Sequence, residues 1–169
     1  MNAVLAAWNN ADADTARAAM IACCGAHRWA EGMIALRPIQ SVLELSDAAD
    51  RIWDTMTEED WLEAFACHPR IGARKPAHAS AQSQTWSKQE QASTASAAQK
   101  VLDDLAAGNA LYEERFGFTY IVCATGKTPE EMLAILTRRL ASDRASELRE
   151  AAEQQRQITQ IRLGKWLIS

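Results

Sequence analysis

The sequence TEEDWLEAFACHPRIG, at residues 57–72, carries the signals for a complete helix, from its first turn to its end. Thr57 supplies an N-cap oxygen, and the three acidic residues after it suit the positive end of the helix dipole. Pro69 cannot donate a backbone N–H and disfavours helical geometry at the residue before it, so we expect the helix to end at about His68. The apolar face of this helix is formed by Trp61, Leu62, Phe65 and Ala66.

His68 should therefore leave a packed helix on a constrained backbone, where its imidazole can be aimed at a ligand. That placement suits a proton-transfer group. Histidine also has structural uses, and a partly buried imidazole that finishes the helix is the alternative interpretation. Cys67 is adjacent, but successive side chains of a helix point about 100° apart, so we do not expect a Cys67–His68 nucleophile pair.

The composition favours a single helical domain over residues 1–169. With 169 residues, of which 48% are hydrophobic and 24% charged, the chain can bury one core. Its seven glycines and four prolines are few, and β-branched runs are scarce. The net charge of −4 argues against nucleic acid as a partner. Arg138-Arg139 forms a small basic spot, which we interpret as a solvated face.

The cysteines and the hydropathy favour a cytoplasmic protein. Cys23, Cys24, Cys67 and Cys123 form no Cys-x-x-Cys pair and follow no secretory signal, so we expect reduced thiols. Since no apolar stretch approaches the length of a membrane span, a membrane partner is not expected. The chain ends Trp166-Leu167-Ile168-Ser169, which is not a peroxisomal address.

Apolar spacing and capping residues predict an all-α, single-domain multi-helix bundle. The last helix places Leu148, Ala151, Gln155, Ile158 and Arg162 in rough register. A guanidinium on or beside that apolar stripe must snorkel to solvent, find a partner or meet an anionic ligand. The predicted helices cover residues 11–24, 28–36, 41–56, 57–68, 87–112, 128–140 and 142–167.

Residues 73–85 form a long polar loop, and loops of this length often cover or form a ligand site. His78 lies inside it. His68 and His78, with Cys67, lack a recognisable ligand spacing, so we expect no metal site.

Two further segments combine structural signals with a possible binding role. Ser87-Lys88-Gln89-Glu90 fits a capping box, but the same hydroxyl, carboxylate and N–H groups could receive a polar small molecule. Residues 116–123 look extended, yet a lone strand would leave backbone groups unpaired in a helical domain. We therefore favour a short, buried, irregular segment whose free N–H and C=O groups face a ligand.

Taken together, six motifs resemble those of a known family. The ordered set covers nearly the whole chain and is similar to OHCU decarboxylase, the 2-oxo-4-hydroxy-4-carboxy-5-ureidoimidazoline decarboxylase of urate degradation. The HPRIG form of the histidine motif resembles bacterial members. The motifs are Ala22-Cys23-Cys24-Gly25, Arg28-Trp29-Ala30-Glu31, His68-Pro69-Arg70-Ile71-Gly72, Ser87-x-x-Glu90-Gln91, Phe116-Gly117-Phe118 and Arg162-Leu163.

The resemblance implies an all-helical homodimer that needs no cofactor and removes CO2 from OHCU to give (S)-allantoin. It makes His68 the catalytic acid or base, and it has Glu90 orient the substrate or share the proton work. Arg162 would hold substrate oxygens. The other ligand-contacting positions that it implies are Pro69, Ser87, Gln91 and the backbone near Ile121 and Val122.

The chemistry is compatible with these residue types. Loss of CO2 next to a carbonyl or imine leaves electrons that delocalise onto oxygen or nitrogen, so neither a metal nor thiamine is obligatory if donors stabilise that charge. Two alternatives stay open. One is another cofactor-free enzyme of ureide or purine breakdown, such as a hydrolase using His68 and Glu90. The other is a helical binding module without catalysis.

Overall fold

The computed structural model describes residues 1–70 and 99–169. The predicted long loop and the Ser87–Glu90 capping box lie outside the described residues. The chain divides into two compact units. The first unit is Met1–Ala64 with Arg156–Ser169, and the second unit is Phe65–Gln155.

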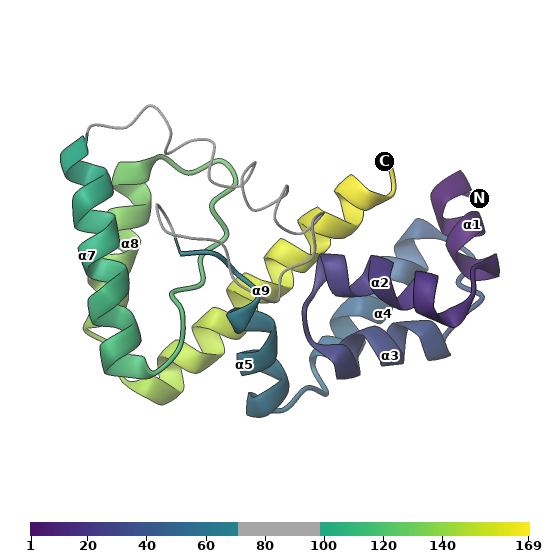
Figure 1. The fold of residues 1–169 in the computed structure, drawn as a ribbon, viewed down its shortest axis with the longest axis horizontal. Coiled ribbons are helices and arrows are strands. Elements are labelled where there is room, and N and C mark those ends of the chain that lie inside the picture. The colour runs from purple at the N-terminus through teal and green to yellow at the C-terminus, as the bar shows by residue number, and fades with distance from the viewer. Residues whose placement is uncertain (71–98) are drawn as a thin grey trace. The chain divides into compact units, whose positions relative to one another are not determined.

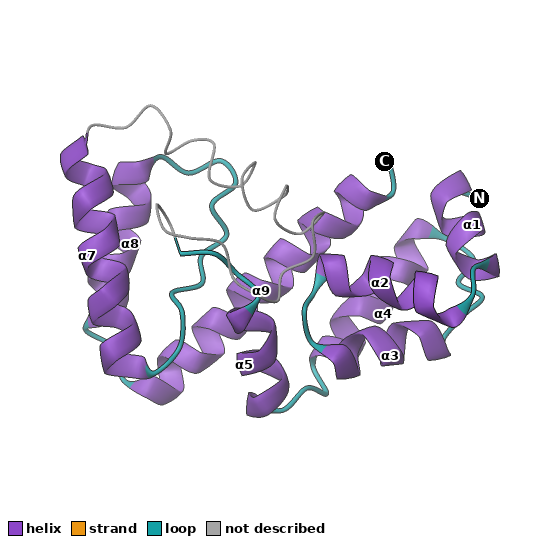
Figure 2. Ribbon diagram, viewed as in Figure 1, coloured by secondary structure: helices purple, strands orange, loops and turns teal. Residues whose placement is uncertain are grey.

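All regular structure in the two described ranges is helical, which confirms the predicted fold class (Figure 2). No helix within these ranges is long and apolar enough to cross a bilayer. The helices are α1 (Ala3–Asn10), α2 (Ala13–Cys23), α3 (His27–Ala35), α4 (Val42–Trp53), α5 (Glu58–Ala66), α7 (Gln99–Phe116), α8 (Pro129–Leu140) and α9 (Arg144–Trp166).

Tryptophans organise the core of the first unit. The Trp29 side chain is fully buried, and its indole N–H donates to the Ala49 carbonyl at 3.0 Å, which joins α3 to α4. The Trp8 indole N–H donates to the Ala16 carbonyl at 3.0 Å and joins α1 to α2. These bonds let large apolar rings be buried without leaving an indole N–H unsatisfied.

Helix α1 was not predicted. Asn2 caps it, because the Asn2 side-chain oxygen accepts from the backbone N–H groups of Val4 and Leu5 at 2.9 and 3.1 Å. The Asn2 amide also donates to the Leu167 carbonyl at 3.0 Å. The cap is a recognised helix-start signal, but a helix of eight residues is stable mainly through tertiary packing.

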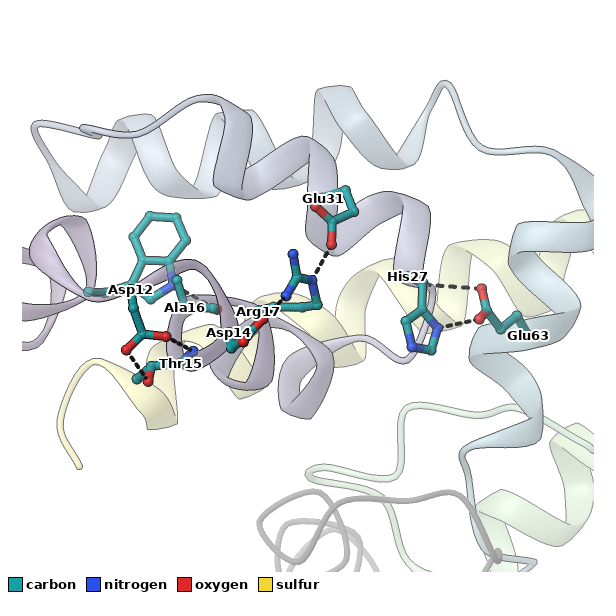
Figure 3. Close-up of polar contacts among 9 residues, drawn as sticks. Asp12, Asp14, Thr15, Ala16, Arg17, His27, Glu31 and Glu63 are labelled. Carbon is teal, nitrogen blue, oxygen red and sulfur yellow. Dashed lines mark hydrogen bonds and ion pairs between the residues drawn. The ribbon is translucent and has the colours of Figure 1, made fainter.

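Surface ion pairs in the first unit connect α2, α3 and α5 (Figure 3). Arg17 lies between Asp14, at 2.6 Å, and Glu31. Glu63 accepts from the His27 backbone N–H at 3.1 Å and also contacts the His27 ring, at the start of α3. Because these side chains are substantially exposed, the ion pairs contribute little to stability, and we interpret them as structural contacts.

Helices α7 and α8 form the frame of the second unit. They lie side by side and run in the same direction, since the connection between them returns along the pair (Figure 1). Gly108 permits their close approach, because a Cβ there would lie 2.5 Å from a Leu136 methyl group. Thr128 and Glu131 form a capping box at the start of α8, which begins within a residue of the predicted helix 128–140.

The connection between α7 and α8 confirms the predicted irregular segment. Phe118 to Ala124 has no strand or helix, and it buries large aromatic side chains against α7. The Tyr112 ring centroid lies 5.7 Å from that of Phe118 and 5.3 Å from that of Tyr120. Aromatic packing, instead of ladder hydrogen bonds, therefore holds the extended chain in place.

Thr57 and Asp60 begin α5. The Thr57 backbone N–H and hydroxyl donate to one Asp60 oxygen at 2.8 and 2.9 Å, and the Arg28 guanidinium donates to the same oxygen at 2.8 Å. Burial alone would raise the pKa of Asp60, but the bonds from Thr57 and the charge of Arg28 outweigh it and hold the pKa below its ordinary value of 3.8.

We expect Asp60→Asn to lower the free energy of unfolding near neutral pH by about 1–3 kcal/mol, because it removes a carboxylate that accepts three hydrogen bonds. A depressed pKa adds stability above the unfolded-state pKa, and that stability is lost as the pH falls through the folded-state pKa. The difference from the wild type should therefore shrink at about pH 3. Urea titrations at the two pH values measure it, with exposed Glu59→Gln in the same helical turn as control. A loss of unfolding free energy in Asp60→Asn that is equal at both pH values would contradict a stabilising role of the ionised Asp60 carboxylate.

Candidate active site

His68 lies just beyond the end of α5, as predicted. Helix α5 ends at Ala66, and the His68 backbone N–H donates to the Phe65 carbonyl at 3.1 Å. Phe65 is buried, and its ring lies 5.6 Å from that of Phe118. The backbone that carries the imidazole is thus anchored by an aromatic contact on one side and followed by Pro69 on the other.

The imidazole of His68 is held by a glutamine from α9. The Gln155 side-chain oxygen lies 2.6 Å from His68 Nε2, and Gln155 is fully buried while His68 is partly exposed. An amide oxygen only accepts hydrogen bonds, so the ring nitrogen Nε2 is the donor in this contact. The contact therefore orients the ring.

The chain beyond Pro69 is tied to α7 by an ion pair. The Arg70 guanidinium donates to both Glu113 oxygens, with Nη2 lying 2.5 Å from Oε2. These bonds and the carboxylate charge raise the pKa of Arg70. The paired geometry restrains the residues on the C-terminal side of His68.

Side chains bind three backbone groups of the irregular segment. The Arg139 guanidinium donates to the Ile121 carbonyl at 2.5 Å. The Cys123 N–H donates to the Gln154 side-chain oxygen, and the Lys127 ammonium donates to the Cys123 carbonyl, both at 2.8 Å. The expectation that this segment offers free backbone groups to a ligand is therefore wrong at these three groups, because buried backbone polar groups take the nearest available partners.

Arg139 lies in a buried cluster, so its interpretation as part of a solvated basic spot is wrong. Arg138 is exposed, whereas the Arg139 side chain is fully buried. Its Nε donates to Glu147 at 2.9 Å, and the Tyr112 hydroxyl donates to the same carboxylate at 2.5 Å. Burial and the bond to Glu147 raise the pKa of Tyr112, so its hydroxyl stays protonated. Consecutive helix positions face different directions, which separates the two arginines.

Arg162 belongs to the first unit and is almost fully buried on α9, at 1% exposure. Burial raises the pKa of the Cys23 thiol, and the Arg162 charge opposes that rise. Cys23 therefore stays a neutral thiol. The burial of Arg162 confirms the prediction that it lies on the apolar stripe of the last helix. Leu148, Ala151, Gln155 and Ile158 are buried on the same helix, as its register predicted.

The predicted site residues fall into three groups. His68, Pro69, Ile121 and Val122 lie in the second unit, and Arg162 lies in the first. Ser87, Glu90 and Gln91, like His78, lie outside the described residues. Convergence of the imidazole, the carboxylate and the guanidinium on one substrate therefore stays a prediction.

A comparison with protein families supplies the identification. Residues 9–164 match the family described as OHCU decarboxylase. The chain belongs to the OHCU decarboxylase family. The predicted family resemblance is thereby confirmed over both units and along most of the sequence.

Relatives named for urate degradation support this assignment. The chain is 35% identical over 144 residues to the uric acid degradation bifunctional protein TTL of Arabidopsis thaliana. That match covers 85% of this chain but 44% of the plant protein, so the chain spans less than half of that relative. It is 28% identical over 137 residues to the 2-oxo-4-hydroxy-4-carboxy-5-ureidoimidazoline decarboxylase of Haloferax volcanii, covering 76% of this chain and 74% of that protein.

The fold agrees with a solved member of the family. A crystal structure of OHCU decarboxylase in the presence of (S)-allantoin superposes with a TM-score of 0.75 at 34% sequence identity. The superposition covers 88% of this chain and 96% of that one. The all-helical architecture is therefore that of an OHCU decarboxylase.

The polar partners of the His68 ring and of the irregular segment were not predicted from the sequence. Gln155 was placed on the apolar stripe of α9 without a role, and Gln154, Glu147 and Arg139 were not assigned to the site. A polar residue at a core position of a helix is the signal that could have found Gln155, because such a side chain requires a partner.

We expect Arg139→Met to lower the free energy of unfolding by about 3–5 kcal/mol, because it leaves the Glu147 carboxylate buried without its cation. The exposed neighbour Arg138→Met is the matched control and should change stability by less than about 0.5 kcal/mol. Urea denaturation of both variants makes the comparison. Adding Glu147→Gln to Arg139→Met should recover part of the loss, and equal effects of the two arginine variants would contradict the buried cluster.

Proposed function

We propose that this protein is a carboxy-lyase that decarboxylates OHCU to (S)-allantoin in urate degradation. The main support is the family match over residues 9–164. Further support comes from the arrangement at His68, where the imidazole is held in one orientation by a buried glutamine. That is the preparation that a general acid or base requires.

In the proposed reaction, His68 exchanges a proton with the substrate through Nδ1. It takes the hydroxyl proton of OHCU on Nδ1, or, once the ring is protonated, delivers the Nδ1 proton to the carbon that loses CO2. A ring held on one side delivers the proton to one face, which would yield one enantiomer of allantoin. Proton transfer by a positioned side chain contributes roughly 10²–10⁴-fold to the rate.

The remaining site residues receive binding roles in this proposal. Glu90 orients the ureido group or shares the proton work, and Arg162 holds substrate oxygens. A guanidinium that is 1% exposed is suited to an anionic group, since charge-assisted hydrogen bonds strengthen away from water. Pro69, Ser87, Gln91 and the chain at Ile121 and Val122 complete the proposed binding site. The charge that develops as CO2 leaves is stabilised by these donors, without a cofactor.

Three further features belong to the proposal. Residues 1–169 act as a single OHCU decarboxylase-like domain, which the family match across both units supports. The protein is a homodimer, as the family resemblance implies. It is located in the cytoplasm, which agrees with four cysteines that form no disulfide in the described residues.

His68→Asn and Glu90→Ala should each abolish the acceleration by the protein, a loss of roughly 10²–10⁴-fold, because each removes a group that handles protons or substrate. OHCU is generated in place from urate, and the chirality of allantoin is followed by circular dichroism together with CO2 release. Far-UV signal verifies that the variants are folded. Ammonia or a ring-opened acid without CO2 would instead indicate a hydrolase, and full activity of His68→Asn would contradict the mechanism.

Arg162→Lys should raise KM more than it lowers kcat, because lysine keeps the charge but loses the planar, bidentate donor geometry. Steady-state kinetics on freshly generated OHCU measure both constants. Arg156→Lys on the same helix is the control, since Arg156 is half-buried and pairs with Asp50 at 3.1 Å. If Arg162→Lys leaves KM at the wild-type value, Arg162 does not bind the substrate.

A further inference from the structure

Gln155 is a fully buried polar side chain of α9. Burying an amide is unfavourable unless its polar atoms are hydrogen-bonded, so the side chain requires a specific partner. Its oxygen lies 2.6 Å from His68 Nε2, a partner 87 residues away along the chain. The glutamine therefore has a fixed position from which it can hold the imidazole.

The chemistry of an amide suits this task. Its oxygen accepts a proton-bearing nitrogen and thereby selects the Nε2–H tautomer. A carboxylate in the same place would also accept the bond, but its negative charge would favour the protonated imidazole. Glutamine orients the ring without adding that charge, so the ring keeps its ability to take up and release a proton near neutral pH.

The neighbouring residue, Gln154, holds a second part of the site. Its oxygen accepts from the Cys123 N–H at 2.8 Å, next to the proposed substrate-binding residues Ile121 and Val122. Consecutive helix residues point about 100° apart. Within the second unit, two adjacent side chains of α9 thus hold the imidazole and the irregular segment at a separation that the rigid helix sets.

We propose that Gln155 is a positioning residue of the decarboxylase, which holds His68 as the Nε2–H tautomer so that Nδ1 exchanges the proton with the substrate. Gln154 plays the corresponding part for the backbone at Cys123. The proposal rests on the proposed function of His68 and adds which nitrogen reacts and what selects it.

The tautomer can be measured without substrate. With ¹⁵N-labelled histidine, the chain gives signals from only three histidines, and His68→Asn identifies those of His68. In the wild type, Nε2 should show the shift of a protonated nitrogen and Nδ1 that of an unprotonated one. Gln155→Leu should abolish this preference. An Nδ1–H ring in the wild type, or an unchanged pattern in Gln155→Leu, would overturn the proposal.

The pH dependence of the rate provides a readout that a purely structural role would not change. In Gln155→Glu the carboxylate still accepts from Nε2, but it raises the pKa of His68. In the plot of kcat/KM against pH, the inflection caused by His68 should therefore move to higher pH by about one pH unit or more. The matched control is Gln154→Glu, which adds the same charge one residue away, towards Cys123, and should shift the limb less. Both variants keep the charges of Arg70 and Glu113, so these two groups do not cause a difference between the two pH profiles. Equal shifts would overturn the assignment to Gln155.

Removal of the amide separates positioning from binding. Gln155→Leu should lower kcat by roughly 10²-fold with little change in KM, because a misoriented imidazole loses the reactive geometry while the substrate contacts remain. If Gln155→Leu does not fold, the Gln155→Glu profile and the wild-type tautomer still decide the question. If the tautomer is as expected but neither the wild type nor any variant releases CO2, the proposed function is wrong, whereas the positioning of His68 by Gln155 is retained. Activity that depends on His68 but is insensitive to Gln155→Leu overturns only the positioning role.

Discussion

Polar side chains buried along α9 must find their partners inside the protein, and the arrangement of each unit follows from this requirement. In the second unit, Glu147 is bound by Arg139 and by the Tyr112 hydroxyl, and Gln155 is bound to His68. In the first unit, the partly buried Gln160 amide donates to Asp50 at 2.8 Å and to the Ser46 carbonyl at 3.0 Å. Because an unsatisfied buried polar group is costly, these contacts select one register of α9 within each unit.

The same requirement explains how a chain segment without regular structure is held in the second unit. The irregular segment has no strand partner, so its backbone groups are bound by Arg139, Gln154 and Lys127. Arg139 lies on α8, Lys127 just before it, and Gln154 on α9. Backbone in such a position is rigid without belonging to a sheet. A site built on rigid elements holds its groups more accurately than one on a free loop.

The chemistry assigned to this family needs little more than orientation and donors. Loss of CO2 from a carbon beside a carbonyl or imine requires a place for the electrons and a correctly placed proton. A helical scaffold offers both, because helix ends expose constrained side chains and buried helix faces hold polar partners for them. His68 at the end of α5 and Gln155 on the buried face of α9 combine these two features.

The sequence by itself determined the helical class, most helix boundaries and the family. Capping residues such as Thr57 and Thr128, and the proline after His68, act over a few residues, so their effect can be inferred locally. It also placed Arg162 on the buried stripe of the last helix. It failed to predict α1, whose eight residues owe their stability to packing, and it placed Arg139 on the surface.

Only the tertiary structure decided which distant groups meet. His68 and Gln155 are 87 residues apart, and Arg139 reaches a carbonyl 18 residues before it. Helical periodicity gives the face on which a side chain lies, but the identity of its partner depends on how separate elements pack. The residue types of the candidate site could thus be predicted from sequence, whereas the contact between His68 and Gln155 and the support of the Ile121 backbone are consequences of the fold.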